Sequence, residues 1–335
     1  MHRDCVIGVD LGGTKLLGGV LDSSLGVHVR LQRDVPLGAD GARGGREDGE
    51  RVISTLVALI EELRAASPAP VRALGIGVPC LLDPAREVIE MAVNLPLRDL
   101  PLRARCAELL GLPTYLDNDA NAALLAESRA GAARGAGDAL MLTIGTGIGG
   151  AILCGGSIYR GAGGGAGELG HMVIDEDGPP CQGNCPNHGC LESLASGSAL
   201  AREALRLARS TPDCGLGRAL AAGRKITGPL VTELAHDGDQ AARDVIALIG
   251  TRLGVGLASL VNIFNPDVVV IGGGVIAAGE YLLAPARSVM RGRALAPAVG
   301  RVKVLRAELG AESGMIGAAL LALVESGMAV GAELQ

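Results

Sequence analysis

Two short apolar segments of this chain each run into a turn of glycine and threonine and then resume as an apolar strand. The turns are Asp10-Leu-Gly-Gly-Thr-Lys15 and Gly145-Thr-Gly-Ile-Gly-Gly150. A strand–turn–strand unit that recurs about half a chain later indicates two similar halves. Strands alternate with amphipathic helical segments along the rest of the 335 residues. This alternation predicts an α/β fold with sheets flanked by helices.

Both turns offer groups that bind an anion, namely backbone N–H groups, a hydroxyl and, in the first turn, an ammonium group. The residues are Gly12, Gly13, Thr14 and Lys15 in the first turn and Gly145, Thr146 and Gly147 in the second. An ordinary glycine hairpin is the alternative for each. The second turn also fits the G-x-G-x-x-G pattern, but that fingerprint needs a following helix. Ala151-Ile-Leu-Cys154 indicates a strand instead, which argues against a nicotinamide-dependent dehydrogenase.

A third glycine turn follows the buried strand at 268–271 and precedes a helix at 280–290. Its N–H groups, from Gly272, Gly273 and Gly274, are suited to contact a phosphate or a nucleoside. A tight β-to-α turn without a ligand is the simpler explanation of this turn taken alone.

Two carboxylates and two carboxamides are crowded where a strand ending at Leu116 meets a helix beginning near Ala122. The stretch is Asp117-Asn118-Asp119-Ala120-Asn121. Such a junction is a usual place for a ligand site in an α/β fold. The alternative is that Asn118 or Asp119 serves as the N-cap of the helix.

A short loop carries the donors of a metal site. Cys181, Cys185 and Cys190 have the spacing C-x3-C-x4-C, and His171 lies ten positions upstream. Three cysteines and one histidine predict a zinc ion with four protein ligands, which makes it structural rather than catalytic. His188 is a rival for the histidine position, and three free thiols are the alternative without metal. Glu168 and Glu192 bracket this set.

Composition excludes several classes of protein. Aromatic residues make up 1% of the chain and the net charge is −6, so base-stacking platforms and a basic surface for nucleic acid are missing. No run of eighteen apolar residues indicates a membrane span, and no apolar run of signal-peptide length opens the chain. We therefore expect a cytoplasmic protein with no nucleic-acid or membrane partner.

Taken together, the motifs resemble those of the ROK family (repressor, open reading frame, kinase), a branch of the actin/hexokinase superfamily. The matching stretches are DLGGTK (10–15), DNDANAALLAE (117–127), GTGIGGAIL (145–153), GELGH (167–171), CPNHGCLE (185–192) and VVIGGGV (269–275). The resemblance implies two ribonuclease-H-like (actin-like ATPase) domains with a cleft for sugar and ATP. We expect a smaller domain at 1–117, joined by the last helix at 312–326, and a larger one at 118–311 with the zinc loop at 171–190. A homodimer or tetramer is also implied.

The resemblance assigns roles to the residues that match its motifs. Asp119 is the expected catalytic base on the sugar 6-hydroxyl. The sugar contacts implied are Asn94, Asn118, Glu168, His171 and Glu192. The first turn (Asp10, Gly12, Gly13, Thr14 and Lys15) and the second (Gly145, Thr146 and Gly147) are expected to bind the phosphates of ATP, with Asp10 near Mg²⁺. Gly272, Gly273 and Gly274 are expected to meet the adenosine.

Two positions depart from the family pattern. The first two cysteines of the family's zinc loop are one residue apart, whereas Cys181 and Cys185 are separated by three residues, so the role of Cys181 is open. A bulge at Gly183 would let the loop close. Cys80 follows Pro79, where the family commonly has glycine.

The sequence leaves the substrate open. Glucose is the expected sugar, with N-acetylmannosamine, N-acetylglucosamine, fructose and allose as alternatives, and polyphosphate could replace ATP. A sugar-responsive repressor of the same family carries an N-terminal helix-turn-helix, and we expect no room for one before the first hairpin. A non-catalytic zinc-stabilised binding protein would not need Asp119.

Overall fold

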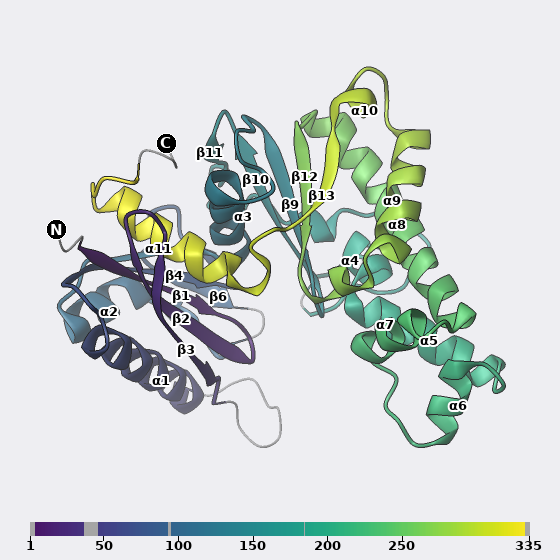
Figure 1. The fold of residues 1–335 in the computed structure, drawn as a ribbon, viewed down its shortest axis with the longest axis horizontal. Helices are drawn as coiled ribbons and strands as arrows, with labels where there is room; N and C mark the ends of the chain where they lie inside the picture. The colour runs from purple at the N-terminus through teal and green to yellow at the C-terminus, as the bar shows by residue number, and fades with distance from the viewer. Residues whose placement is uncertain (1–3, 37–45, 93–94, 184, 332–335) are drawn as a thin grey trace. The chain divides into compact units, whose positions relative to one another are not determined.

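The computed structural model describes residues 4–36, 46–92, 95–183 and 185–331 (Figure 1). The chain forms two compact units. Unit 1 comprises the residues up to Gly135, Ile152–Ala166 and those from Glu308, and unit 2 comprises Ala136–Ala151 and Gly167–Ala307. The expected division after residue 117 assigns the helix that begins at Asp119 to the second domain, whereas the compact units place it in unit 1.

Unit 1 is built on a five-stranded sheet in the order β3-β2-β1-β4-β8. The β1–β2 and β2–β3 pairs are antiparallel, whereas β1–β4 and β4–β8 are parallel. The strands are β1 (Cys5–Leu11), β2 (Lys15–Asp22), β3 (Val27–Asp34), β4 (Val71–Val78) and β8 (Thr114–Asn118). A three-stranded sheet consists of β5 (Cys80–Leu82), β6 (Ile89–Ala92) and β7 (Arg98–Leu100). The helices are α1 (Arg46–Ala65), α2 (Leu102–Leu110), α3 (Asp119–Ala130) and α11 (Ser313–Glu325).

A second five-stranded sheet has the order β11-β10-β9-β12-β13. Numbered along the chain, each of the two large sheets places its strands in the order third, second, first, fourth, fifth, which confirms two similar halves. The strands are β9 (Ala139–Ile144), β10 (Ile148–Cys154), β11 (Ser157–Ile158), β12 (Val268–Gly272) and β13 (Lys303–Arg306). The helices of unit 2 are α4 (Leu191–Ala195), α5 (Gly197–Ser210), α6 (Gly215–Ala221), α7 (Gly228–His236), α8 (Gln240–Phe264), α9 (Glu280–Arg293) and α10 (Ala298–Arg301).

Helices cover both faces of the unit 1 sheet, with α1 on one side and α11 on the other (Figure 1). Glycines in the central strands set how closely they approach. A Cβ at Gly18 would lie 2.6 Å from a methyl carbon of Leu63 in α1, whereas one at Gly75 would lie 1.8 Å from the carbonyl oxygen of Ala318 in α11. The backbone of α11 therefore rests directly on the sheet, where no side chain larger than hydrogen fits.

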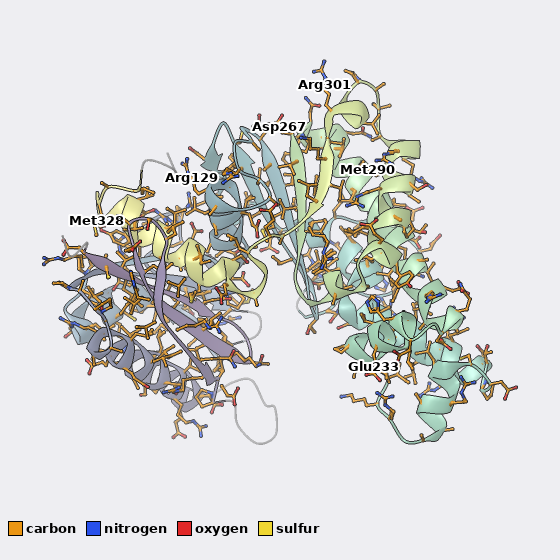
Figure 2. The ribbon with its side chains drawn as sticks, in the orientation of Figure 1. Arg129, Glu233, Asp267, Met290, Arg301 and Met328 are labelled. Atoms are coloured by element: carbon orange, nitrogen blue, oxygen red, sulfur yellow. The ribbon has the colours of Figure 1, made fainter. Side chains whose placement is uncertain are left out.

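The long helix α8 forms the core of unit 2. A Cβ at Gly250 would lie 2.3 Å from the carbonyl oxygen of Leu282 in α9, so these helices also pack backbone to backbone. By length and composition α8 could cross a membrane, yet 56% of its most apolar window is buried. Its apolar surface is thus used for packing. At the sheet, the Asp267 carboxylate (labelled in Figure 2) accepts hydrogen bonds from the N–H groups of Gly137 (3.1 Å) and Asp138 (3.3 Å).

Some local expectations were wrong. The sequence predicts one helix over 194–209, but the chain breaks at Ser196 into α4 and α5. The Ser196 hydroxyl accepts a hydrogen bond from the N–H of Ala199 (3.3 Å) and begins a new helix as its N-cap. The stretch 36–50 is rich in glycine and charge and predicts a surface loop. It lies partly outside the described residues, and α1 already begins at Arg46.

The packing of α11 predicts that replacing one of its glycines by alanine destabilises the protein, which is the opposite of what helix propensity predicts. Replacing Gly317 by alanine in a helix interior ordinarily stabilises by about 1 kcal/mol. A Cβ here would lie 1.7 Å from the carbonyl oxygen of Ala122 in α3, so we expect Gly317→Ala to destabilise by at least ~2 kcal/mol through overpacking. Gly292→Ala in α9 is the matched control, because its Cβ would meet nothing within 4 Å. Denaturant unfolding measures both, and equal effects would refute the close contact.

Candidate functional site

Three parallel strands of unit 1 end in a row of polar residues and glycine. Asp10 of β1 pairs with Gly77 of β4, and Gly77 pairs with Asp117 of β8. Asp119 follows at the start of α3, and its Cα would lie 3.5 Å from a Cβ at Gly77. The carboxyl ends of parallel strands are the usual ligand-binding edge of an α/β sheet. The structure therefore brings Asp10, Asn118 and Asp119 to such an edge.

Asn118 is the N-cap of α3. Its Oδ1 accepts hydrogen bonds from the N–H groups of Ala120 (2.9 Å) and Asn121 (3.4 Å), and its Nδ2 donates to the carbonyl of Cys80 (3.3 Å). The N-cap interpretation is thus confirmed for Asn118. Asp119 is the first residue of the helix, where the positive end of the helix dipole favours a carboxylate.

Asp117 is a buried structural anchor. Its side chain accepts from the Asn121 amide (2.9 Å) and from Nε of Arg160 (3.0 Å), and Nη1 of Arg86 lies 3.8 Å away. No sequence pattern predicts the role of Arg160, which lies in a glycine-rich stretch 43 residues away. This arginine neutralises the buried charge next to Asn118 and Asp119.

Asp10 is held in an unusual electrostatic environment. Burial, reinforced by the charge of Asp119, raises the pKa of Asp10 to about 7. The carboxylate also abuts the first turn of α11, where a Cβ at Gly314 would lie 2.7 Å from Cγ of Asp10. Two neighbouring carboxylates that resist joint ionisation suit a divalent cation, whose charge relieves the repulsion.

The first glycine turn is exposed at its tip, at Thr14 and Lys15. It is closed by a hydrogen bond from the N–H of Gly12 to the carbonyl of Lys15 (2.9 Å). The carbonyl of Thr14 in turn accepts from the N–H of Val35 (2.9 Å). The hydroxyl and ammonium groups predicted to bind an anion therefore lie at the tip of a hairpin whose turn is held by these two hydrogen bonds.

The second glycine turn, in unit 2, is fixed by the start of α5. The N–H of Gly197 donates to the carbonyl of Gly145 (2.8 Å), and the Ser198 hydroxyl donates to that of Thr146 (2.8 Å). The turn runs directly into strand β10, which confirms that it is a hairpin and not a dinucleotide fingerprint. The third turn is close by, since a Cβ at Gly197 would lie 3.3 Å from Cγ2 of Val275.

The third turn, at Gly272, Gly273 and Gly274, requires glycine. Gly273 has φ of 84°, and a Cβ there would lie 2.5 Å from the carbonyl oxygen of Ile144 at the end of β9. The second and third turns thus lie at the carboxyl ends of the adjacent parallel strands β9 and β12. This edge repeats the arrangement seen in unit 1.

Glu168, His171 and Glu192 form one cluster in unit 2. Oε2 of Glu168 lies 3.7 Å from Nε2 of His171. Oε2 of Glu192 accepts from the N–H of Ile148 (2.7 Å), which ties this carboxylate to the second turn. The Glu168 side chain is 53% exposed. Partial desolvation still raises its pKa, and His171 opposes the effect while the charge of Glu192 adds to it. The cluster offers acceptors and a donor of the kind that grip a polyol.

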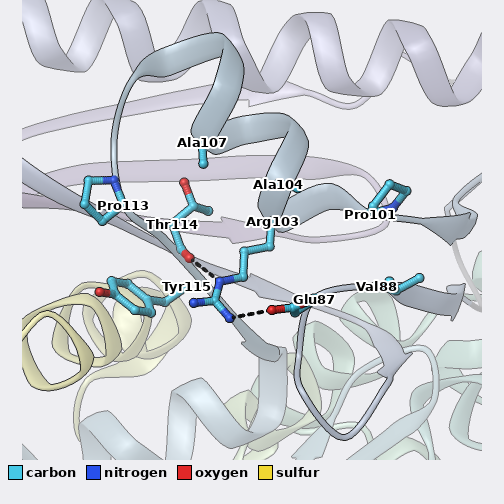
Figure 3. Close-up of a pocket in the computed structure, with 9 residues that line it drawn as sticks. All are labelled: Glu87, Val88, Pro101, Arg103, Ala104, Ala107, Pro113, Thr114 and Tyr115. Atoms are coloured by element: carbon cyan, nitrogen blue, oxygen red, sulfur yellow. Dashed lines mark hydrogen bonds and ion pairs between the residues drawn. The ribbon is translucent and has the colours of Figure 1, made fainter.

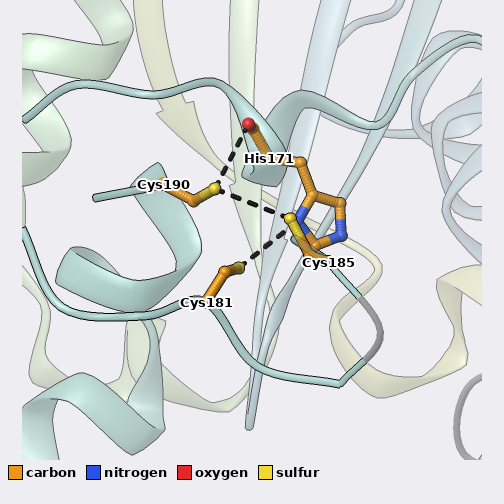
Figure 4. Close-up of side chains that lie close together, drawn as sticks. All are labelled: His171, Cys181, Cys185 and Cys190. Carbon is orange, nitrogen blue, oxygen red and sulfur yellow. Dashed lines mark hydrogen bonds between the residues drawn. The ribbon is translucent and has the colours of Figure 1, made fainter. Parts of the chain in front are cut away.

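The four predicted metal ligands converge beside this cluster (Figure 4). Sγ of Cys185 and Sγ of Cys190 are 3.8 Å apart, and Sγ of Cys181 lies 3.5 Å from Nδ1 of His171. Tetrahedral zinc, with bonds of about 2.3 Å to sulfur and 2.0–2.1 Å to nitrogen, separates such pairs by about 3.8 Å and 3.6 Å. The donor set therefore fits zinc, with His171 rather than His188 and with Cys181 included. Gly183, at φ of 63°, makes the turn in the long Cys181–Cys185 spacing.

A pocket of about 370 Å³ in unit 1 is lined by a separate set of residues (Figure 3). Nε of Arg103 donates to the carbonyl of Thr114 (3.0 Å), and its guanidinium carbon lies 5.6 Å from the centre of the Tyr115 ring. The predicted site residues do not line it. The predicted sugar contact Asn94 lies outside the described residues.

The sequence profile of the ROK family matches residues 6–325. A glucokinase from Halalkalibacterium halodurans is 34% identical over 316 residues, covering 93% of this chain and 92% of that protein. A putative xylose repressor from Caldicellulosiruptor sp. is 34% identical over 89% of this chain and 73% of the repressor. The crystal structure of a ROK family glucokinase from Streptomyces griseus, in complex with glucose and AMPPNP, superposes with a TM-score of 0.82 at 34% identity, covering 95% of this chain and 99% of that one. This match confirms the expected α/β fold with actin-like ATPase domains.

The raised pKa of Asp10 predicts a pH-dependent stability. Its folded pKa of about 7 exceeds the ordinary value of 3.8, so the folded state holds a proton that the unfolded state has lost. The free energy of unfolding therefore falls as pH rises from about 4 to about 7. Asp10→Asn cannot ionise, so its stability advantage over the wild type should grow by a few kcal/mol across that range, at about 1.4 kcal/mol per pKa unit. Urea unfolding without added Mg²⁺ measures this, and parallel pH curves would contradict it.

Proposed function

We propose that this chain, which belongs to the ROK family, is an ATP-dependent hexose kinase that phosphorylates glucose on its 6-hydroxyl group. The observation that carries the proposal is the placement of Asp119 at the start of α3, beside Asp10 at the carboxyl edge of the sheet. The glucokinases among its relatives support glucose as the sugar and ATP as the donor.

Asp119 is the proposed general base. Phosphoryl transfer asks the protein mainly to position the reactants and neutralise charge, and one residue must orient and deprotonate the hydroxyl nucleophile. A carboxylate at hydrogen-bond distance suits that task. We assign Mg²⁺ to Asp10; the metal, bound with ATP, would neutralise charge on the transferred phosphoryl group.

The remaining residues divide between the sugar and the nucleotide. We assign the hydroxyls of the hexose to Asn94, Asn118, Glu168, His171 and Glu192. We assign the phosphates to the turns at 12–15 and 145–147 and the adenosine to the turn at 272–274. Oε2 of Glu192 accepts a hydrogen bond from the end of the second turn. We therefore infer that the sugar-binding and phosphate-binding residues of unit 2 hold each other in place.

Zinc bound by His171, Cys181, Cys185 and Cys190 is the proposed structural cofactor. Four protein ligands leave no open position for a catalytic water. Nδ1 of His171 faces the cysteines and Nε2 faces Glu168, so the metal would fix the ring that holds this carboxylate. We further propose a cytoplasmic homodimer or tetramer.

A sugar-responsive regulator is the second candidate. Similarity to a putative xylose repressor over 89% of this chain favours it. A regulator would bind sugar and transfer no phosphoryl group, so the same assay separates the two functions.

A coupled ADP-release assay over a panel of hexoses and N-acetylhexosamines, at saturating Mg·ATP, tests the kinase. Glucose should give the highest kcat/KM. Polyphosphate should be tried as an alternative donor with glucose 6-phosphate as the measured product, because this donor releases no ADP. Asp119→Asn should lower kcat by about 10²- to 10⁴-fold, because a base is lost while a hydrogen-bonding group remains. Sugar affinity should change little. Absence of turnover on every hexose would refute the kinase, and near-normal kcat in Asp119→Asn would refute the base.

The zinc proposal has its own measurement. Elemental analysis should find about one zinc per chain, as expected for a four-ligand site. Cys185→Ser should lose the metal and weaken glucose affinity by releasing His171 and Glu168. Cys154→Ser is the matched control, because Cys154 is exposed and outside the cluster. A metal-free wild type with full activity would contradict the proposal.

A further inference from the structure

Helix α3 carries a second buried carboxylate, two turns beyond Asp119. Glu127 has an exposed fraction of 0%. Its Oε2 accepts from the N–H groups of Ala132 (2.8 Å) and Glu308 (3.1 Å), and its Oε1 accepts from that of Leu309 (2.9 Å). In the part of the chain that the structure describes, no cationic side chain pairs with it. Three backbone N–H groups therefore carry the whole compensation of this charge.

These N–H groups lie next to places where the chain passes from one unit to the other. Glu308 is the first residue of unit 1 after Ala307 of unit 2, and Ala132 lies three residues before the passage that follows Gly135. The Glu127 side chain thus holds the unit 1 residues that adjoin two of the places where the chain crosses between the units. Its site is also tight, because a Cβ at Gly131 would lie 2.1 Å from Oε2.

The segment held by Glu127 leads directly into α11. Gly314, five residues after Leu309, abuts the Asp10 carboxylate, and Gly317 packs on the backbone of Ala122 in α3. Helix α3, the segment 308–309 and the start of α11 therefore form one connected body. That body begins with Asp119 and contacts Asp10.

We propose that Glu127 is a positioning residue that fixes the segments 131–135 and 308–309 on helix α3, so that Asp119 and Asp10 keep their relative placement during turnover. The inference rests on the proposed kinase function for its kinetic consequence. The hydrogen-bond pattern itself is independent of that function. Glutamine can supply one acceptor oxygen, but its NH₂ group would face an N–H donor, so Glu127→Gln should act as a partial defect and Glu127→Ala as a larger one.

The test combines kinetics with hydrogen exchange. We expect Glu127→Gln to lower kcat on glucose at least about tenfold, with a smaller change in KM for ATP. Leu124→Ala is the matched control, because Leu124 is a buried apolar residue of the same helix. It should lower Tm as much or more, yet keep kcat within about twofold. In the wild type, the amides of Ala132, Glu308 and Leu309 should exchange slowly, and in Glu127→Gln they should exchange at least about tenfold faster.

The outcomes separate this inference from the function on which it rests. Fast exchange at these three amides in the wild type, or unchanged exchange in Glu127→Gln, would overturn the contact, and this measurement needs no turnover. Wild-type kcat in Glu127→Gln, or an equal loss in Leu124→Ala, would overturn the positioning role. A wild type that phosphorylates no hexose would instead refute the kinase, together with any kinetic role of Glu127.

Discussion

The close contact of helix α11 with the unit 1 sheet is the constraint on which the site depends. Carbonyl oxygens of α11 lie where Cβ atoms of Gly8 and Gly75 would clash with them, and the carbonyl oxygen of Ala122 in α3 lies equally close to where a Cβ of Gly317 would stand. Because the contact is between backbones, it has little freedom to slide or repack. It delivers Gly314 to the side of Asp10, and in this way residues at the two ends of the chain define one edge of the sheet.

The four carboxylates near this edge differ in how the surrounding residues compensate their charges. Asp117 is neutralised by Arg160 and bonded to Asn121, and Glu127 is satisfied by three backbone N–H groups. Asp10 has the opposite environment, since burial and Asp119 raise its pKa to about 7. The charges of Asp117 and Glu127 are thus compensated within the chain, whereas the charge of Asp119 adds to the raised pKa of Asp10. A carboxylate with a perturbed pKa is typical of sites that bind a cation or a substrate.

Short sequence motifs predicted those parts of the structure that depend on residues close together in the chain. The two glycine hairpins predicted two similar halves, and the four predicted zinc ligands converge even with the long Cys181–Cys185 spacing, because Gly183 adopts a positive φ. Contacts between distant segments could not be predicted in this way. Arg160 on Asp117 and Glu127 on residues 308–309 join positions 43 and about 180 residues apart, and no spacing in the sequence marks either pair.

The junction at 117–121 shows why the N-cap and the ligand-site interpretations are not alternatives. Oδ1 of Asn118 is committed to capping α3, so this residue can meet a ligand only through the second hydrogen of Nδ2, whose first hydrogen goes to the Cys80 carbonyl. Capping therefore makes Asn118 a donor of fixed direction. The capped helix in turn sets the placement of Asp119, which as a carboxylate can only accept. In the proposed reaction, a sugar hydroxyl at this edge would accept a hydrogen bond from Asn118 and transfer its proton to Asp119, so the cap determines which of the two residues donates and which accepts.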